Sequence, residues 1–387
     1  MAINDIFFAT NRRISQENPL EFDYRLYPQK PFFFRVGVAK VEKLDGSPWD
    51  LEGEGYEMRS AEIYDEIEPS EQHRDGVPAS PRLFAAIQKT VTENPRDVLA
   101  FIHGFSSSFE SSMCRANELR DVYRSPGRCP HTGDFTGPRE PVTFAFSWPS
   151  DESVWDGEGL RWAYHSDRDD AAASSRAMAR FALKVQAYLS KIDRRARCHQ
   201  RINLVAHSMG NWAFANAIQS LVSIAEEEGL AIRPMFDNVF LMAADLDAQA
   251  LNKSDMLGPL LQIAKRIHVY HAANDFALSL SNAKHGKPRL GHDGPLDLPM
   301  STGNVFAVDC SLVSDTPADS HRHQYYRLAP EVISDVRQVL AGVDMDRITG
   351  REPVSERKWR IERDAKARGE QQSSRPGQPN RPKGRRR

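Results

Sequence analysis

The residues around Ser208 have types and spacing that would support nucleophilic chemistry. The stretch LVAHSMGNW places Ser208 between an apolar run that ends at His207 and a helix-like run that begins at Gly210. The residues two positions before and after the serine, Ala206 and Gly210, are both small, as a sharp turn with a strained backbone requires. Such a turn would present the hydroxyl at the end of a strand. A serine becomes a nucleophile when a base removes its proton and an acid orients that base.

An acid and a base of the required types follow the serine along the chain. Asp275 comes just after the strand-like run RIHVYHA, and His321 and His323 come after the next such run, NVFAVDC. We expect Asp275 to orient the base, in preference to Asp245 and Asp247 at the preceding strand end, because it directly precedes a helical run on the last strand but one. His323 is the expected base on its spacing before the final helix, and His321 is the alternative.

The same chemistry needs two backbone N–H groups that bind the oxyanion formed on the carbonyl. We expect one from Met209, directly after the serine. We expect the other from Phe105, in the stretch His103-Gly104-Phe105 after the run DVLAFIH, because a glycine lets the backbone turn inward. Other histidines, such as His207, are expected to be packed and hydrogen-bonded. No ligand spacing indicates a metal site, and the chemistry needs no cofactor.

Short apolar runs alternate with helix-like runs through most of the chain, and this alternation predicts the frame that positions these residues. Several runs are continuously apolar, as strands covered on both faces of a parallel sheet are. The sequence therefore predicts an α/β fold with a mostly parallel sheet of about eight strands, flanked by helices on both faces. The expected strands are 3–10, 31–41, 97–103, 141–148, 201–207, 237–244, 266–272 and 304–310, and the expected helices are 80–91, 107–123, 167–192 and 210–229.

The ends of this frame are expected to differ from its middle. No helix separates the first two strands, which indicates an antiparallel edge. Residues 281–303, rich in Gly, Pro and His, are expected to form a long loop over one face. Residues 1–345 are expected to form one domain and residues 346–387 a disordered basic tail with, at most, a short helix at 353–368. Residues 351–387 hold 13 basic and 5 acidic side chains, an excess that would bind nucleic acid or an acidic partner only weakly.

Composition is that of a globular protein. The chain has 387 residues, 40% of them hydrophobic, which suffices for a sizeable core. Its four cysteines are scattered without a CxxC pair, as in a protein whose thiols stay reduced. The N-terminal stretch lacks the pattern of a signal peptide, and no apolar run approaches the roughly 20 residues that span a bilayer. These features favour a cytoplasmic protein and do not fix its oligomeric state.

Five stretches together resemble a known superfamily. FIHGFSSSFE, FSWPS, AHSMGNW, HAANDFALSLS and PRLG are similar to α/β-hydrolases, and in particular to a bacterial branch of serine hydrolases called DUF900, a domain of unknown function. The HG pair and the serine turn are common to the superfamily, whereas SWPS and the D-x-A-L run are more typical of the branch. The resemblance covers residues 3–343 and implies the α/β-hydrolase fold with a Ser–Asp–His triad. It implies no substrate.

These observations predict a serine hydrolase that cleaves a small-molecule carboxylic ester through an acyl-enzyme intermediate. The same triad would serve an amidase, a thioesterase or a lipase, because the shape of the pocket selects the leaving group. A second hypothesis is a hydrolase fold that acts as an interaction module and binds a partner with its basic tail. The candidates at every catalytic position argue against this second hypothesis.

Overall fold

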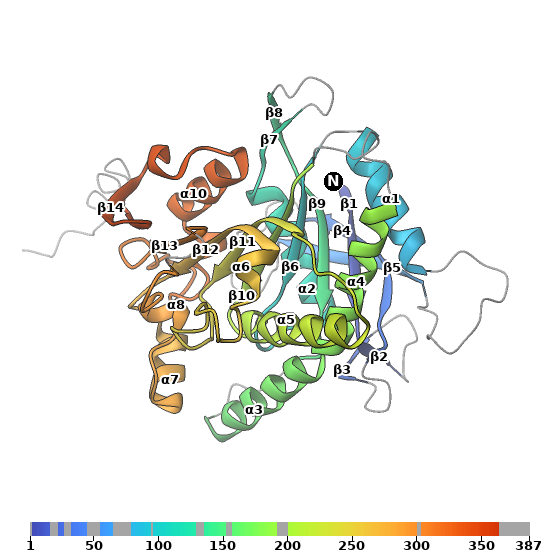
Figure 1. The fold of residues 1–387 in the computed structure, drawn as a ribbon, viewed down its shortest axis with the longest axis horizontal. Helices are drawn as coiled ribbons and strands as arrows, with labels where there is room; N and C mark the ends of the chain where they lie inside the picture. Colours follow the sequence, from blue (N-terminus) through green and yellow to red (C-terminus); the bar gives the residue numbers. More distant parts are fainter. Residues whose placement is uncertain are drawn as a thin grey trace, which may run out of the picture.

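A wide, mostly parallel sheet forms the centre of the molecule (Figure 1). The computed structural model describes residues 2–15, 22–26, 32–44, 55–64, 79–93, 96–128, 135–151, 157–191, 200–299 and 303–363. The sheet has 11 strands in the order β14-β15-β13-β12-β11-β10-β6-β9-β1-β4-β5. Its strands are β1 (Ile3–Thr10), β4 (Arg35–Lys43), β5 (Tyr56–Tyr64), β6 (Val98–Ile102), β9 (Val142–Ser147), β10 (Ile202–His207), β11 (Phe236–Met242), β12 (Ala264–His271), β13 (Val305–Asp309), β14 (Arg351–Ser355) and β15 (Lys358–Ile361).

The strand directions confirm the predicted arrangement. All neighbouring pairs from β1 through β9, β6, β10, β11, β12 and β13 to β15 are parallel. The pair β1–β4, formed by the first two predicted strands, is antiparallel, as are β4–β5 and β14–β15. The sheet is wider than the predicted eight or so strands because β5, β14 and β15 were not expected. β5 and β14 lie at the two edges, where the residues of β5 are half-buried or exposed and those of β14 mostly exposed, so no continuous apolar run marks them.

The C-terminal hairpin corrects the expectation of a tail without structure from residue 346. β14 and β15 occupy the stretch 351–361 where a short helix was predicted, and β15 pairs with β13. Alternate residues of KWRI are buried: Trp359 and Ile361 point into the core, so the stretch has the period of a strand. The expected domain boundary at residue 345 thus precedes two strands of the main sheet. Residues 364–387, which hold much of the basic charge, lie outside the described residues.

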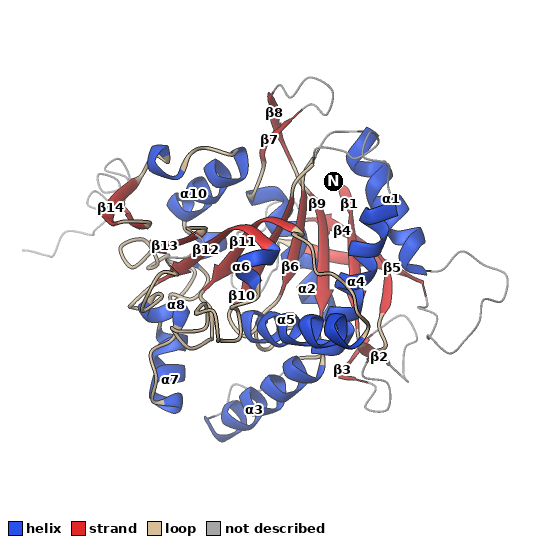
Figure 2. Ribbon diagram, in the orientation of Figure 1, coloured by secondary structure: helices blue, strands red, loops and turns tan. Residues whose placement is uncertain are grey.

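Helices cover both faces of the sheet (Figure 2). One buried cluster joins the sheet to α1 (Ala79–Glu93), α4 (Ser175–Lys191) and α5 (Gly210–Glu227). The other joins the opposite face to α2 (Phe109–Val122) and α10 (Pro330–Ala341). Strand β1 contributes alternate residues to the two clusters, Phe7 to the first and Phe8 to the second, as the two-residue period of a strand requires.

Two helical regions differ from the sequence prediction. The single helix expected at 167–192 is divided into α3 (Gly157–Ala173) and α4, and the junction residue Ser174 accepts a hydrogen bond from Asn11. The long loop expected at 281–303 is partly helical. Its first residues belong to α7 (Phe276–His285), which ends at Gly286 with φ 64°, and α8 (Leu290–Asp293) follows. A left-handed glycine is a common helix terminator.

The remaining elements are short. They are the strands β2 (Arg12–Ile14), β3 (Phe22–Leu26), β7 (Ser125–Arg128) and β8 (Phe135–Arg139), the helices α6 (Leu260–Ile263) and α9 (Tyr325–Leu328), and the 3₁₀ turn η1 (Met345–Arg347). Within the described part of the chain, every helix is too short or too polar to cross a bilayer.

Candidate active site

Ser208 lies on a strained turn between β10 and α5. Its φ is 53°, in the left-handed region that a side chain rarely adopts, and its N–H donates to the Met242 carbonyl of the next strand at 3.0 Å. The turn fits because Gly210 has no side chain: a Cβ there would clash with the carbonyl oxygens of Ile102 and His103. Strain of this kind is commonly kept at functional sites. The strand–turn–helix predicted from the sequence is therefore present, with Ser208 at its bend.

His323 and Asp275 form a hydrogen-bonded pair at the carboxyl ends of the strands. His323 Nδ1 lies 2.7 Å from Asp275 Oδ2, and the Asp275 side chain is fully buried. The other oxygen of Asp275 accepts the Leu278 N–H at 3.0 Å and so caps α7. With one oxygen fixed by the helix, the second is aimed at the imidazole. The carboxyl group therefore holds the tautomer with a proton on Nδ1, which leaves Nε2 as the acceptor.

The pKa of His323 is raised above its ordinary value. Burial is the largest influence and by itself lowers this pKa, because it disfavours the charged ring. The negative charge of Asp275 and its hydrogen bond together outweigh burial and favour the imidazolium. This is the electrostatic arrangement that a base needs when it must hold a proton during a reaction.

His207 connects the serine turn to His323. The rings of His207 and His323 have centroids 4.7 Å apart, and His207 Nε2 lies 3.1 Å from the His323 carbonyl oxygen. A carbonyl only accepts, so Nε2 is the protonated nitrogen of His207. Burial lowers the pKa of His207 well below its usual value, with His323 adding to the effect. Among the described residues no hydrogen bond joins Ser208 Oγ to His323, whereas His207, the residue before Ser208, contacts His323.

The two backbone N–H groups expected to bind the oxyanion make no other hydrogen bond among the described residues. Across the described residues, the N–H groups of Phe105 and Met209 donate to no protein acceptor. Gly104 packs against the turn at Ser208, since a Cβ added to it would lie 3.0 Å from the Cβ of Ser208. The structure thus brings the His103–Phe105 loop against Ser208, which Met209 directly follows in the chain. Two unpaired N–H groups beside one hydroxyl are what an oxyanion hole requires.

Asp167 holds this loop, a role that its sequence context does not indicate. Its carboxylate accepts hydrogen bonds from the Ser106 N–H at 3.1 Å, the Asp151 N–H at 2.6 Å and the Ser150 hydroxyl. Ser106 itself has φ 53°. Burial raises the pKa of Asp167 to about 6, although the hydrogen bonds oppose the rise. Asp167 stands in the acid-rich helix stretch DRDDAAA, where nothing in the spacing distinguishes a loop-binding carboxylate from an exposed one.

The rival acids Asp245 and Asp247 are bound elsewhere. Arg289 donates to Asp245 Oδ1 through Nε at 3.0 Å and Nη2 at 2.7 Å, and to Asp247 Oδ1 through Nη1 at 2.6 Å. Asp245 also accepts hydrogen bonds from Tyr164 and Ser281 at 2.5 and 2.6 Å. Burial alone would raise the pKa of Asp245, but Arg289 outweighs it and the pKa is lowered. Of the three acids, Asp275 is the one that contacts His323.

The alternative histidine, His321, differs from His323 in burial and in its partners. Its side chain is exposed, and its carbonyl oxygen accepts the Phe276 N–H at 3.0 Å. Asp319 accepts the N–H groups of His321 and Gln324 and thereby shapes the turn that carries His323. The backbone of His321 therefore supports the turn, while the ring of His323 meets Asp275.

His103 and Trp148 pack beside the site. Their rings are stacked with centroids 4.9 Å apart, and Trp148 Nε1 donates to the His103 carbonyl at 2.9 Å. Burial, with a smaller effect of Arg12, lowers the pKa of His103 to about 3. The neutral ring packs beside the backbone from which the Phe105 loop departs, and Trp148 is fully buried against it.

Metal-ligating residues do not gather in the described ranges, where no group of three or more His, Cys, Asp or Glu side chains has a suitable arrangement. The buried cysteines Cys114 and Cys310 are free thiols, and burial raises the pKa of both. Cys129 and Cys198 lie outside the described residues.

A parallel sheet with a strained serine turn and a His–Asp pair at its carboxyl edge defines an α/β hydrolase. The family model of α/β hydrolases of unknown function, DUF900, matches residues 83–341, and the chain belongs to this family. It is also similar to the uncharacterized protein alr1448 of the cyanobacterium Nostoc sp., with 20% identity over 312 residues that cover 66% of this chain and 77% of that protein.

Proposed function

We propose that this α/β hydrolase cleaves a carboxylic ester with Ser208 as nucleophile, His323 as base and Asp275 as the acid that orients it. The proposal is carried by the 2.7 Å hydrogen bond between His323 and the buried Asp275, next to a serine in the left-handed conformation. Family membership supports hydrolysis in general. The choice of an ester rests on the chemistry of the serine triad alone.

The reaction proceeds in two halves. His323 Nε2 takes the proton of the Ser208 hydroxyl while Oγ bonds to the carbonyl carbon, and the N–H groups of Phe105 and Met209 bind the oxyanion. The C–O bond to the leaving alcohol then breaks as His323 returns the proton to it. In the second half, His323 removes a proton from water, which attacks the acyl-enzyme and releases the carboxylic acid and Ser208.

A fluorophosphonate probe, which reacts with activated serines, tests the proposal. We expect the full-length protein to be labelled and the Ser208→Ala variant to remain unlabelled. Ser223→Ala, an exposed position on α5, is the matched control and should be labelled as the wild type is. Failure to label the folded wild-type protein would favour the interaction-module hypothesis.

A panel of p-nitrophenyl esters of different chain lengths, with matched amides and thioesters, tests the bond that is cleaved. We expect the esters to be turned over fastest. Preferential cleavage of an amide or thioester would be consistent with the proposed triad but would contradict an ester as the substrate. The same panel with a chain truncated after residue 363 tests the basic tail, which we propose affects binding of partners but not ester turnover.

A further inference from the structure

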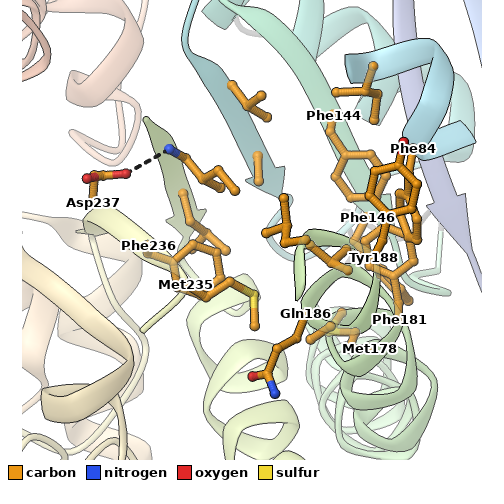
Figure 3. Close-up of a pocket in the computed structure, with 18 of the residues that line it drawn as sticks. Phe84, Phe144, Phe146, Met178, Phe181, Gln186, Tyr188, Met235, Phe236 and Asp237 are labelled. Atoms are coloured by element: carbon orange, nitrogen blue, oxygen red, sulfur yellow. Dashed lines mark hydrogen bonds between the residues drawn. The ribbon is translucent and has the colours of Figure 1, made fainter. Parts of the chain in front are cut away.

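A large apolar cavity lies on the face of the sheet that α1, α4 and α5 cover (Figure 3). Its volume is about 790 Å³, within the roughly 300–1,000 Å³ of small-molecule sites. Figure 3 shows the rings of Phe84, Phe144 and Phe181 along one wall and Met235 and Phe236 along the other. Its described lining does not include Ser208, Asp275 or His323. The cavity is therefore separate from the proposed active site.

The cavity opens at the edge of the sheet opposite to Ser208. Its lining includes Val98, Ile202 and Phe236, the first residues of β6, β10 and β11, whereas Ser208 follows the last residue of β10. The lining also reaches Ile102, at the other end of β6. Since a strand rises about 3.3 Å per residue, the cavity extends roughly 13 Å along the sheet. Its elongated, apolar form fits an alkyl chain.

The walls of the cavity are incompletely packed. In α4, Phe181, Val185, Tyr188 and Leu189 face the cavity and are only partly buried, although protein cores normally pack such side chains tightly. Apolar atoms that line a void lose dispersion contacts, and an apolar cavity tends to stay dry and to bind apolar molecules. A bound alkyl chain would therefore be favoured by both burial and contact.

The rim of the cavity carries one cation, Arg233, that has no carboxylate partner among the described residues. The other two cations on the rim are paired: Arg201 Nη2 lies 2.8 Å from Asp97 Oδ2, and Lys265 Nζ donates to Asp237 Oδ1 at 2.6 Å (dashed in Figure 3). Gln200 also lines the rim, and both polar atoms of its amide are buried without a hydrogen-bond partner among the described residues. Buried polar atoms without partners are rare in native proteins. Such atoms on the same rim as Arg233 favour a polar, anionic group at this end of the cavity.

We propose that this cavity binds an amphiphile with an alkyl chain and an anionic head, such as a medium-chain fatty acid. The chain occupies the space between α4 and the sheet, and the head lies at the rim, where Arg233 and the Gln200 amide contact it. The site binds its ligand independently of Ser208 and of hydrolysis.

Calorimetric titration of the full-length protein with decanoate tests the site. We expect binding to the wild type and a loss of roughly tenfold or more in affinity for Ala182→Trp, which fills the cavity. Ala187→Trp, an exposed position on the same helix, is the matched control and should bind normally. Unchanged decanoate affinity in folded Ala182→Trp protein, or no binding by the wild type, overturns the proposal.

Charge reversal at the rim tests the head group and does not alter the core. Arg233 is exposed, so Arg233→Glu should fold normally. We expect it to weaken binding of decanoate but not of decanol, which lacks the charge. Equal effects on both ligands would contradict the anionic head.

A fatty acid that carries a photoreactive diazirine on its chain locates the bound molecule. We expect cross-links to peptides from α1, α4 and residues 233–236. Cross-links to α7 or to the peptide with His323 would place the ligand in the proposed active site and overturn the separate cavity site.

Discussion

Two buried carboxylates at the ends of neighbouring strands have different partners. Asp245 follows β11 and Asp275 follows β12, and both side chains are almost completely buried. Asp245 binds the guanidinium of Arg289, whereas Asp275 binds the imidazole of His323. A guanidinium keeps its proton throughout the accessible pH range, but an imidazole exchanges a proton near neutral pH. The same residue type at the same sheet edge therefore supports structure in one case and, in our proposal, proton transfer in the other.

The number of donors on each carboxylate explains the difference. Asp245 accepts from Arg289, Tyr164 and Ser281, so its oxygens are bound from several sides. Asp275 accepts from one backbone N–H on one oxygen and from His323 on the other. A position at a strand end is thus insufficient to identify a catalytic acid. The partner that the rest of the fold supplies decides its role.

The largest effect is expected when the proposed triad is broken. Ser208→Ala and His323→Ala should each reduce kcat/KM for the best p-nitrophenyl ester by about 10⁴-fold or more, and the double variant should be scarcely slower, because the two residues act as one unit. Steady-state kinetics of the three variants measures this. Losses that multiply in the double variant would show that the two residues act independently.

Substitution of Asp245, the carboxylate bound to Arg289, should lower the stability of the protein and not act directly on the proposed reaction. Asp245→Asn leaves the fully buried Arg289 with a poorly compensated charge, so we expect it to lower the free energy of unfolding by about 3–5 kcal/mol. Asp247→Asn removes the half-exposed partner of the same guanidinium and should cost about 1 kcal/mol or less. Urea denaturation of both variants measures the difference. Equal losses of unfolding free energy in the two variants would mean that burial does not make the Asp245–Arg289 pair more important than the Asp247–Arg289 pair.

Much of the fold could be predicted because the strands in the middle of the sheet are continuously apolar. β10, β11 and β12 are covered on both faces, and this burial appears in the sequence as apolar runs. The edge strands β5 and β14 carry charged and exposed residues and could not be distinguished from loops. The helix break at Ser174 also escaped prediction, because it depends on Asn11, which is distant in sequence.

The features of the proposed site that depend on neighbouring residues could be predicted, and those that depend on distant residues could not. The turn at Ser208 is local, since Ala206, Gly210 and the following helix all lie within a few residues. The preference for Asp275 over Asp245 came from its place in the order of strands, and the contact with His323 agrees with it. Asp167 could not be identified, because it holds the Phe105 loop from a helix about sixty residues away in sequence.

The pH dependence of the reaction follows from the balance at His323. Ester hydrolysis needs the neutral ring, so kcat/KM should fall as the pH decreases through a pKa above the usual value of about 6.5. In Asp275→Asn the largest influence that raises this pKa is gone and burial remains, so the pKa of His323 should fall. NMR titration of the His323 ring measures both values. An unchanged pKa in Asp275→Asn would mean that another charge controls the ring.

The smallest effect is expected at the other histidine of the same turn. His321 contacts Phe276 through its backbone carbonyl, which a substitution keeps, and its ring is exposed. His321→Ala should therefore change kcat/KM by less than about threefold, a transition-state difference of less than about 0.7 kcal/mol, since His323 and not His321 contacts Asp275. Parallel assays of His321→Ala and His323→Ala on one ester compare the two rings directly. If His321→Ala were the inactive variant, the contact between His323 and Asp275 would be structural, and the base would be the ring that lies in solvent.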